Sequence, residues 1–226
     1  MTSESLESPE SPDDLYLASS QEEVVSARPI MTGDVFGEIT IPGLPERGAA
    51  LVLTHPCSMR VDGVRLASRL LMGRVKEAPE IPLHRWSSGH YKVMPLPGLL
   101  GGHYIASFEE IGLVESEEVL STERLACLTP YGANLLQQRL VWYLTRFLAP
   151  THRLSEVTEA VFEEADLCEE WVSRSVATGS DVNEAAALFH EWIRDEDSGG
   201  VTRQSLLAEP QRRAGLRRDM RRHLVS

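Results

Sequence analysis

The spacing of apolar residues changes at Thr129 and Pro130, and this change constrains the fold more than any other feature of the sequence. From residue 28 to residue 128, short apolar runs alternate with glycine and proline, a pattern typical of strands and turns. After Pro130 the apolar residues recur with a helical period. Thr129 is a favourable N-cap, and Pro130 suits a first helical position. The sequence therefore predicts an α+β fold.

We expect three segments along the chain. Residues 1–27 predict a disordered acidic leader, because they hold seven acidic side chains, no lysine or arginine and few apolar groups. Residues 28–128 predict a small β-barrel domain built from short strands. Within it, the continuous apolar run at residues 49–53 predicts a central strand buried on both faces. Residues 129–226 predict a helical extension that ends in a basic amphipathic segment.

Charge divides this helical extension into two parts. Residues 151–200 carry thirteen acidic and three basic side chains, whereas residues 201–226 carry seven basic and two acidic ones. The basic part holds candidate nucleic-acid-binding residues: Arg217, Arg218, Arg221 and Arg222. An alternative is that this segment pairs with the acidic helix expected at residues 155–172, and a third is contact with an anionic membrane surface.

Bulk composition narrows the class of protein. The net charge of −12 disfavours a surface devoted to phosphate backbones. No apolar run approaches the roughly 18–20 residues that span a bilayer, and the acidic N-terminus lacks the apolar stretch of a signal peptide. The three cysteines are widely spaced without a CxxC pair, so a disulfide framework is not expected. These features predict a cytoplasmic protein without a membrane partner.

The densest group of reactive side chains follows the predicted central strand, at residues 54–60. His55 and Cys57 have the types needed for a metal site or for a Cys–His nucleophile, and Ser58 and Arg60 lie in the same loop. A zinc site would need two more ligands, and the other histidines of this region lack a characteristic spacing: His84, His90 and His103. The alternative is that His55 and Cys57 cap the strand and pack on the barrel. We expect no bound metal and no cofactor.

Several segments resemble PemK/MazF-like proteins. They are residues 29–36 (PIMTGDVF), 46–54 (ERGAALVLT), 103–108 (HYIASF), 128–132 (LTPYG) and 135–137 (LLQ). The resemblance to this family covers roughly residues 29–148. It implies an SH3-like barrel and, for toxin members, metal-independent cleavage of single-stranded RNA, with a homodimer and an antitoxin as partners in a toxin–antitoxin, stress or phage-defence setting.

The resemblance also implies catalytic residues. Arg47 matches the family's arginine beside the scissile phosphate, and Thr54 is the candidate partner hydroxyl, with His55 next to it. A guanidinium would stabilise a developing phosphorane, and a hydroxyl would orient the attacking 2′-oxygen. We expect Arg47 and the loop at residues 54–60 to project from one mouth of the barrel.

Three departures from the family pattern keep a second function open. Gly48 stands where the family usually has proline, residues 55–58 (HPCS) are not the usual toxin continuation, and small toxins have no counterpart of residues 151–226. The alternative is a non-catalytic module that binds another protein through a degenerate barrel.

Overall fold

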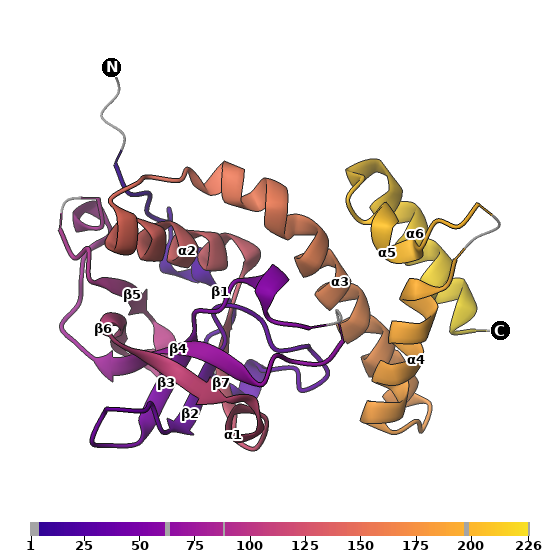
Figure 1. The fold of residues 1–226 in the computed structure, drawn as a ribbon, viewed down its shortest axis with the longest axis horizontal. Coiled ribbons are helices and arrows are strands. Elements are labelled where there is room, and N and C mark those ends of the chain that lie inside the picture. Colours follow the sequence, from indigo (N-terminus) through magenta and orange to yellow (C-terminus); the bar gives the residue numbers. More distant parts are fainter. Residues whose placement is uncertain (1–4, 62–63, 88, 197–198, 226) are drawn as a thin grey trace. The chain divides into compact units, whose positions relative to one another are not determined.

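The computed structural model describes residues 5–61, 64–87, 89–196 and 199–225. The chain forms two compact units (Figure 1). The first, here called the sheet unit, runs up to Val24 and continues from Ile30 to Val157. The second, here called the helical unit, comprises Val25–Pro29 and the residues from Thr158 onward.

The sheet unit is built on one antiparallel sheet with seven strands among the described residues, in the order β1-β7-β2-β3-β4-β6-β5. The strands are β1 (Tyr16–Ala18), β2 (Val35–Ile39), β3 (Gly48–Val52), β4 (Arg69–Glu77), β5 (Val93–Pro97), β6 (His103–Glu115) and β7 (Arg124–Leu128). Two α-helices of this unit are α1 (Ser116–Leu120) and α2 (Pro130–Thr145). One-turn helices precede β1 at Pro12–Leu15 and lie between strands at Gln21–Glu23, Pro56–Ser58, Leu83–Arg85 and Leu99–Gly101. The predicted α+β class is confirmed.

The sheet is open, because its strand order ends at β1 on one edge and at β5 on the other. The two edges nevertheless approach each other, since the Leu100 amide, just after β5, donates a hydrogen bond to the Ser19 carbonyl, just after β1, at 2.8 Å. The sequence predicted a closed barrel instead. Pro95 and Pro97 lie in β5 and carry no N–H, so this strand has few backbone donors for hydrogen bonds to an additional strand.

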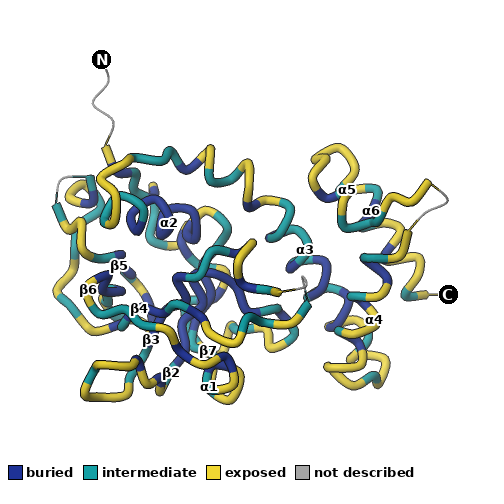
Figure 2. Tube along the Cα trace, in the orientation of Figure 1, coloured by how far each residue is buried: buried dark blue, intermediate teal, exposed yellow. Residues whose placement is uncertain are grey.

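Strand β3 is buried on both faces, as its apolar run predicted. Ala50 and Val52 belong to a core cluster that includes Phe36 and Met72. Leu51 belongs to the other cluster, which is covered by α2. The α2 side chains in this second cluster are Leu135, Leu136 and Leu140. Figure 2 shows the same distribution, with buried residues concentrated on the strands and on α2.

The expected disorder of residues 1–27 is wrong for residues 5–27, and residues 1–4 lie outside the described part of the chain. Leu15 is fully buried, and Tyr16 of β1 pairs with Leu128 of β7. The Thr129 amide donates to the Leu15 carbonyl at 2.8 Å, and Ala27 packs in the helical unit. The few apolar side chains of the leader thus reach buried positions. A count of its charged residues alone therefore underestimates how much of the segment is folded.

Glu7 fixes the leader to two helices. Its carboxylate accepts hydrogen bonds from the Thr151 amide at 2.9 Å, the Thr151 hydroxyl at 2.5 Å and the Gln138 side-chain amide at 2.9 Å. Thr151 begins helix α3 (Thr151–Ala177), whose exposed N–H groups favour an anion. Burial raises the pKa of Glu7, but these hydrogen bonds outweigh burial and hold the pKa below its ordinary value.

We expect Glu7→Gln to lower the free energy of unfolding of the sheet unit by about 1–2 kcal/mol at neutral pH, because a charged acceptor is lost. A depressed carboxyl pKa contributes stability above the unfolded pKa, and that contribution disappears as the pH falls through the folded pKa. Urea unfolding should therefore show a smaller difference between wild type and variant near pH 3 than near pH 7. Glu22→Gln, on an exposed leader residue, is the control. A pH-independent difference would contradict this role.

The helical unit contains most of α3 together with α4 (Val182–Arg194), α5 (Arg203–Leu206) and α6 (Pro210–His223). The Asp181 carboxylate caps α4 by accepting from the Asn183 amide at 2.8 Å. The core of this unit is largely aromatic and aliphatic and includes Trp171, Val172, Phe189, Trp192, Leu216 and Met220. In the described part of the chain, none of the helices combines the length and apolar character needed to cross a bilayer.

Candidate functional site

Thr54 has a structural partner for each of its polar groups. Its hydroxyl oxygen accepts a hydrogen bond from the Leu71 amide at 2.7 Å, and its carbonyl accepts one from the Thr32 hydroxyl. The side chain is half-buried at the end of β3. The Thr54 hydroxyl therefore bridges β3 to β4 where the ladder between these two strands ends.

His55 and Cys57 form a capped turn. The His55 Nδ1 atom accepts a hydrogen bond from the Cys57 amide at 3.2 Å, and burial lowers the pKa of His55, so its neutral form is favoured. Cys57 and Ser58 are exposed, and the Cys57 sulfur lies 3.9 Å from the Val157 carbonyl oxygen. Arg60 donates to the Ile30 carbonyl at 3.0 Å. Among the residues the structure describes, no group of three His, Cys, Asp or Glu side chains is placed to hold a metal.

Arg47 lies at the other end of β3 from Thr54. The strand spans Gly48–Val52, and its five extended residues, at a rise of about 3.3 Å each, hold its two ends roughly 16 Å apart. The Arg47 guanidinium donates to the Glu38 carbonyl at 2.5 Å and is 58% exposed. The expected single mouth is therefore wrong, because an extended strand keeps its two ends apart.

We expect Thr54→Val to lower the free energy of unfolding by about 1–3 kcal/mol, because the Leu71 amide loses its acceptor. Thr54→Ser keeps a hydroxyl and should stay close to the wild type. Chemical denaturation of the three proteins checks this prediction. Equal stability of the Val and Ser variants would show that the Thr54 hydroxyl is not needed for the link between β3 and β4.

The arginines of α6 pair with the acidic face of α3. Arg217 lies 2.8 Å from a Glu163 oxygen and 3.1 Å from a Glu170 oxygen, and Arg221 lies 2.6 Å from Glu170. Arg222 pairs with Asp219 at 2.5 Å on α6 itself, whereas Arg218 is exposed. The hydrogen bond from Arg221 is the largest cause of a lowered pKa at Glu170. Of the readings left open by the sequence, pairing with the acidic helix is the one observed.

We expect Glu170→Gln to loosen α6, because the carboxylate joins Arg217 and Arg221 of α6 to Arg174 of α3. Loss of about 1 kcal/mol speeds amide exchange of α6 by about fivefold. Hydrogen exchange with mass spectrometry measures this rate, and Glu191→Gln, on an exposed residue of α4, is the matched control. Unchanged exchange across α6 would show that these pairs do not hold the helix.

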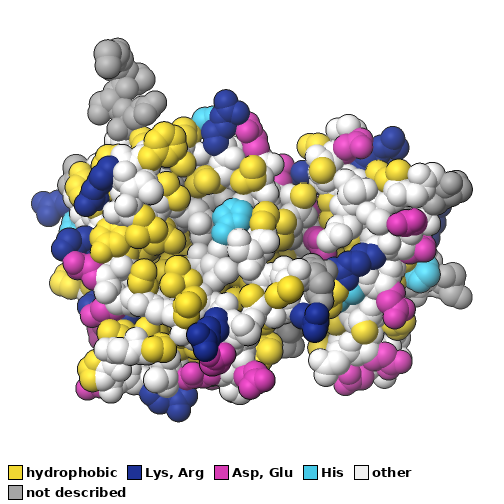
Figure 3. All heavy atoms as spheres, in the orientation of Figure 1, with side chains coloured by type: hydrophobic (Ala, Val, Ile, Leu, Met, Phe, Trp, Pro, Cys, Tyr) yellow, Lys and Arg dark blue, Asp and Glu magenta, His cyan; other side chains and the backbone are white. Residues whose placement is uncertain are grey.

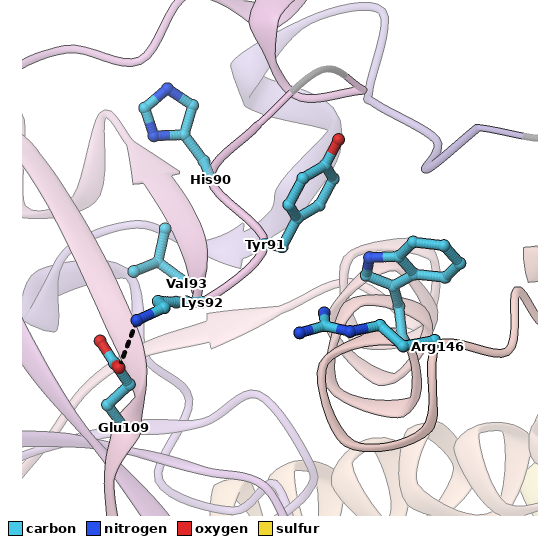
Figure 4. Close-up of a pocket in the computed structure, with 7 residues that line it drawn as sticks. His90, Tyr91, Lys92, Val93, Glu109 and Arg146 are labelled. Carbon is cyan, nitrogen blue, oxygen red and sulfur yellow. Dashed lines mark hydrogen bonds and ion pairs between the residues drawn. The ribbon is translucent and has the colours of Figure 1, made fainter.

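A separate hollow of about 590 Å³ lies in the sheet unit (Figure 4). Its walls come from the loop before β5, from β6 and from the end of α2. The lining residues are His90, Tyr91, Lys92, Val93, Glu109, Trp142 and Arg146. Figure 3 shows hydrophobic side chains beside Lys and Arg side chains on the sheet unit. The hollow thus combines aromatic rings with cations.

Each charged side chain of the hollow has a different environment. Lys92 Nζ lies 2.6 Å from a Glu109 oxygen, and this pairing raises the pKa of Lys92. Arg146 ends α2 with a left-handed backbone, φ 61°, and is exposed. Within residues 5–61, 64–87, 89–196 and 199–225, no hydrogen bond or ion pair neutralises the Arg146 guanidinium. Arg146 therefore leaves a positive charge at the hollow.

The aromatic side chains of the hollow contact each other. The ring centroids of Tyr91 and Trp142 are 6.1 Å apart, with 53° between the ring planes. Tyr91 is 38% exposed, whereas Trp142 is half-buried and its Nε1 atom has no hydrogen-bond partner among the described residues. The Tyr91 ring is therefore the accessible aromatic surface of the pair.

Arg139 fixes the loop that carries these residues. Its guanidinium is fully buried and donates to the Trp86 carbonyl at 3.1 and 3.2 Å and to the Val93 carbonyl at 3.3 Å. It also lies 5.2 Å from the centre of the Trp86 ring. Burial lowers the pKa of Arg139 to about 10, so the side chain stays protonated at neutral pH. Both ends of the loop that holds His90, Tyr91 and Lys92 are thereby anchored to α2.

Sequence reasoning did not identify this hollow. By sequence, Tyr91 and Trp142 are ordinary packing residues of a strand and a helix, and His90 is a candidate only for a metal site. One usable signal was the run His90-Tyr91-Lys92, in which an aromatic residue stands between two basic ones. The other was Trp142 four residues before Arg146, which places both on one side of a helix end. Nothing in the sequence pairs these two signals.

Comparison with known proteins adds no family assignment. No protein-family profile matches the chain, and no curated protein matches it.

Proposed function

We propose that the sheet unit binds single-stranded RNA, as a PemK/MazF-like domain, through the hollow lined by Tyr91 and Arg146. The observation that carries this proposal is the exposed tyrosine ring beside an unneutralised guanidinium. Proteins that bind single strands combine aromatic rings, on which bases stack, with cations that contact the phosphates. The hollow offers both kinds of group within one opening.

The charges around the hollow support it as the RNA-binding surface, although the chain as a whole is acidic. Lys92 is balanced by Glu109, which leaves Arg146 as the lining cation that no described carboxylate pairs with. The arginines of α6 provide less support, because Arg217 and Arg221 are engaged by glutamates. A polyanion is therefore better accommodated at the hollow than at α6.

The proposal is one of binding rather than cleavage. A guanidinium and a hydroxyl that act on one phosphate must lie within hydrogen-bond reach of it. Arg47 and Thr54 stand at opposite ends of β3, and the Thr54 hydroxyl accepts from a backbone amide. These positions favour a barrel that has kept RNA affinity without the implied catalytic pair.

The proposed family relationship would also make the curled sheet a member of the SH3-like class. Support comes from the resemblance over residues 29–148, which runs from the segment before β2 to the end of α2. The hydrogen bond between Leu100 and Ser19, which joins the two ends of the sheet, is consistent with a barrel-like curl. The helical unit lies outside this resemblance.

We expect the purified chain to bind a labelled pool of short unstructured RNA in a fluorescence-anisotropy titration. Tyr91→Ala should weaken binding by about 5- to 100-fold, because stacking on an aromatic ring contributes about 1–3 kcal/mol per base. Arg146→Ala should weaken binding and reduce its salt dependence by about one unit of slope. Arg69→Ala, on an exposed arginine of β4 paired with Glu115, is the matched control.

Two results would contradict this function. Absence of RNA binding together with a stable protein partner would favour the interaction module. RNA cleavage that is lost in Arg47→Ala would restore the catalytic reading.

A further inference from the structure

We infer that the hollow is a one-base subsite, in which an unpaired RNA base stacks on the outer face of Tyr91 while Arg146 contacts the adjoining phosphate. This inference rests on the proposed function and specifies how the RNA is held. In this inference, Tyr91 is the platform, meaning the ring on which the base stacks. Trp142 supports the Tyr91 ring, and Arg139 positions the loop that carries it.

Ring geometry selects the outer face of Tyr91. At 6.1 Å between centroids, Tyr91 and Trp142 already form a contacting aromatic pair. The space between the rings therefore cannot take a third ring without separating them. Tyr91 keeps 38% of its surface exposed, whereas Trp142 is half-buried. A base consequently gains most contact on the exposed part of Tyr91 that Trp142 leaves uncovered.

The cation next to this platform suits a phosphate. Figure 4 shows Tyr91 and Arg146 reaching the opening from two elements, the loop before β5 and the end of α2. Lys92 is held by Glu109, so Arg146 is the side chain that can give a fork of donors to phosphate oxygens. One nucleotide supplies both a ring and a phosphate, and the two side chains match this pair of groups.

The base must be unpaired. In a duplex, each base face is covered by its neighbours, and an RNA helix offers mainly backbone and shallow-groove edges. Stacking on a protein ring requires a splayed base, such as one in a loop or a single strand. The Tyr91 platform therefore predicts discrimination against double-stranded RNA.

Arg139 anchors the backbone on both sides of Tyr91. Its donors hold the Trp86 and Val93 carbonyls, which flank the loop on both sides of Tyr91. Trp86 is itself fixed by donation from its ring N–H to the Ile81 carbonyl at 3.1 Å. Anchored flanks reduce the conformational entropy that binding at Tyr91 has to remove. Arg139 is thus a positioning residue that does not touch the RNA.

The test compares two RNA probes of about 12 nucleotides, within the usual site size for single-strand binding. One is a mixed-sequence unstructured pool, and the other is a ribose-phosphate oligomer of equal length without bases. For the wild type, removal of the bases should weaken binding by about fivefold or more. For Tyr91→Ala, the two probes should bind alike, while Tyr91→Phe should keep the wild-type preference. A duplex of the pool should bind at least about tenfold more weakly than the single strand.

Each outcome separates this inference from the proposed function. If the wild type binds both probes equally and Arg146→Ala weakens both, RNA binding stands and the base platform is overturned. If Tyr91→Ala keeps the preference for bases, the platform lies elsewhere and the inference is again overturned. If the wild type binds neither probe, the proposed function fails as well. Circular dichroism of Tyr91→Ala and Tyr91→Phe establishes that the fold is unchanged.

Discussion

Burial of β3 on both faces is the constraint around which the sheet unit is organised. Ala50 and Val52 pack on one side and Leu51 on the other, so each face of the sheet needs its own cover. Helix α2 covers one face, and the loop with Met59 together with α1 covers the other. The same extended strand holds Arg47 and Thr54 apart. Burial of β3 in the core thus determines which polar side chains can lie close together.

Whereas β3 is constrained by apolar burial, Arg139 constrains the structure as a buried cation, in a place where apolar side chains would otherwise pack. Its donors are used on the Trp86 and Val93 carbonyls, and its guanidinium carbon lies 5.2 Å from the centre of the Trp86 ring. Removing a charged group from water costs several kcal/mol unless hydrogen bonds compensate. Here the compensation comes from the Trp86 and Val93 carbonyls, so one side chain joins α2 to the loop beside the hollow.

Local pattern predicted those features that depend on neighbouring residues. The change of period at Thr129 and the burial of the strand within residues 49–53 are both present. Features set by distant partners were not predictable. Leu15 gives no local sign of the Thr129 amide it bonds, and Tyr91 gives no sign of Trp142, because these contacts arise only when the sheet folds. The alternatives for the α6 arginines needed the same information, since Glu163 and Glu170 lie far away in the sequence.

The prolines of β5 have a consequence for assembly. An outer strand with unpaired N–H groups can recruit a strand from a neighbouring molecule, and Pro95 and Pro97 lack such groups. At the opposite border, β1 is only three residues long. Both borders are therefore poor templates for continuing the sheet into another molecule. If two copies associate, these two borders favour a junction made by side-chain surfaces over a shared sheet.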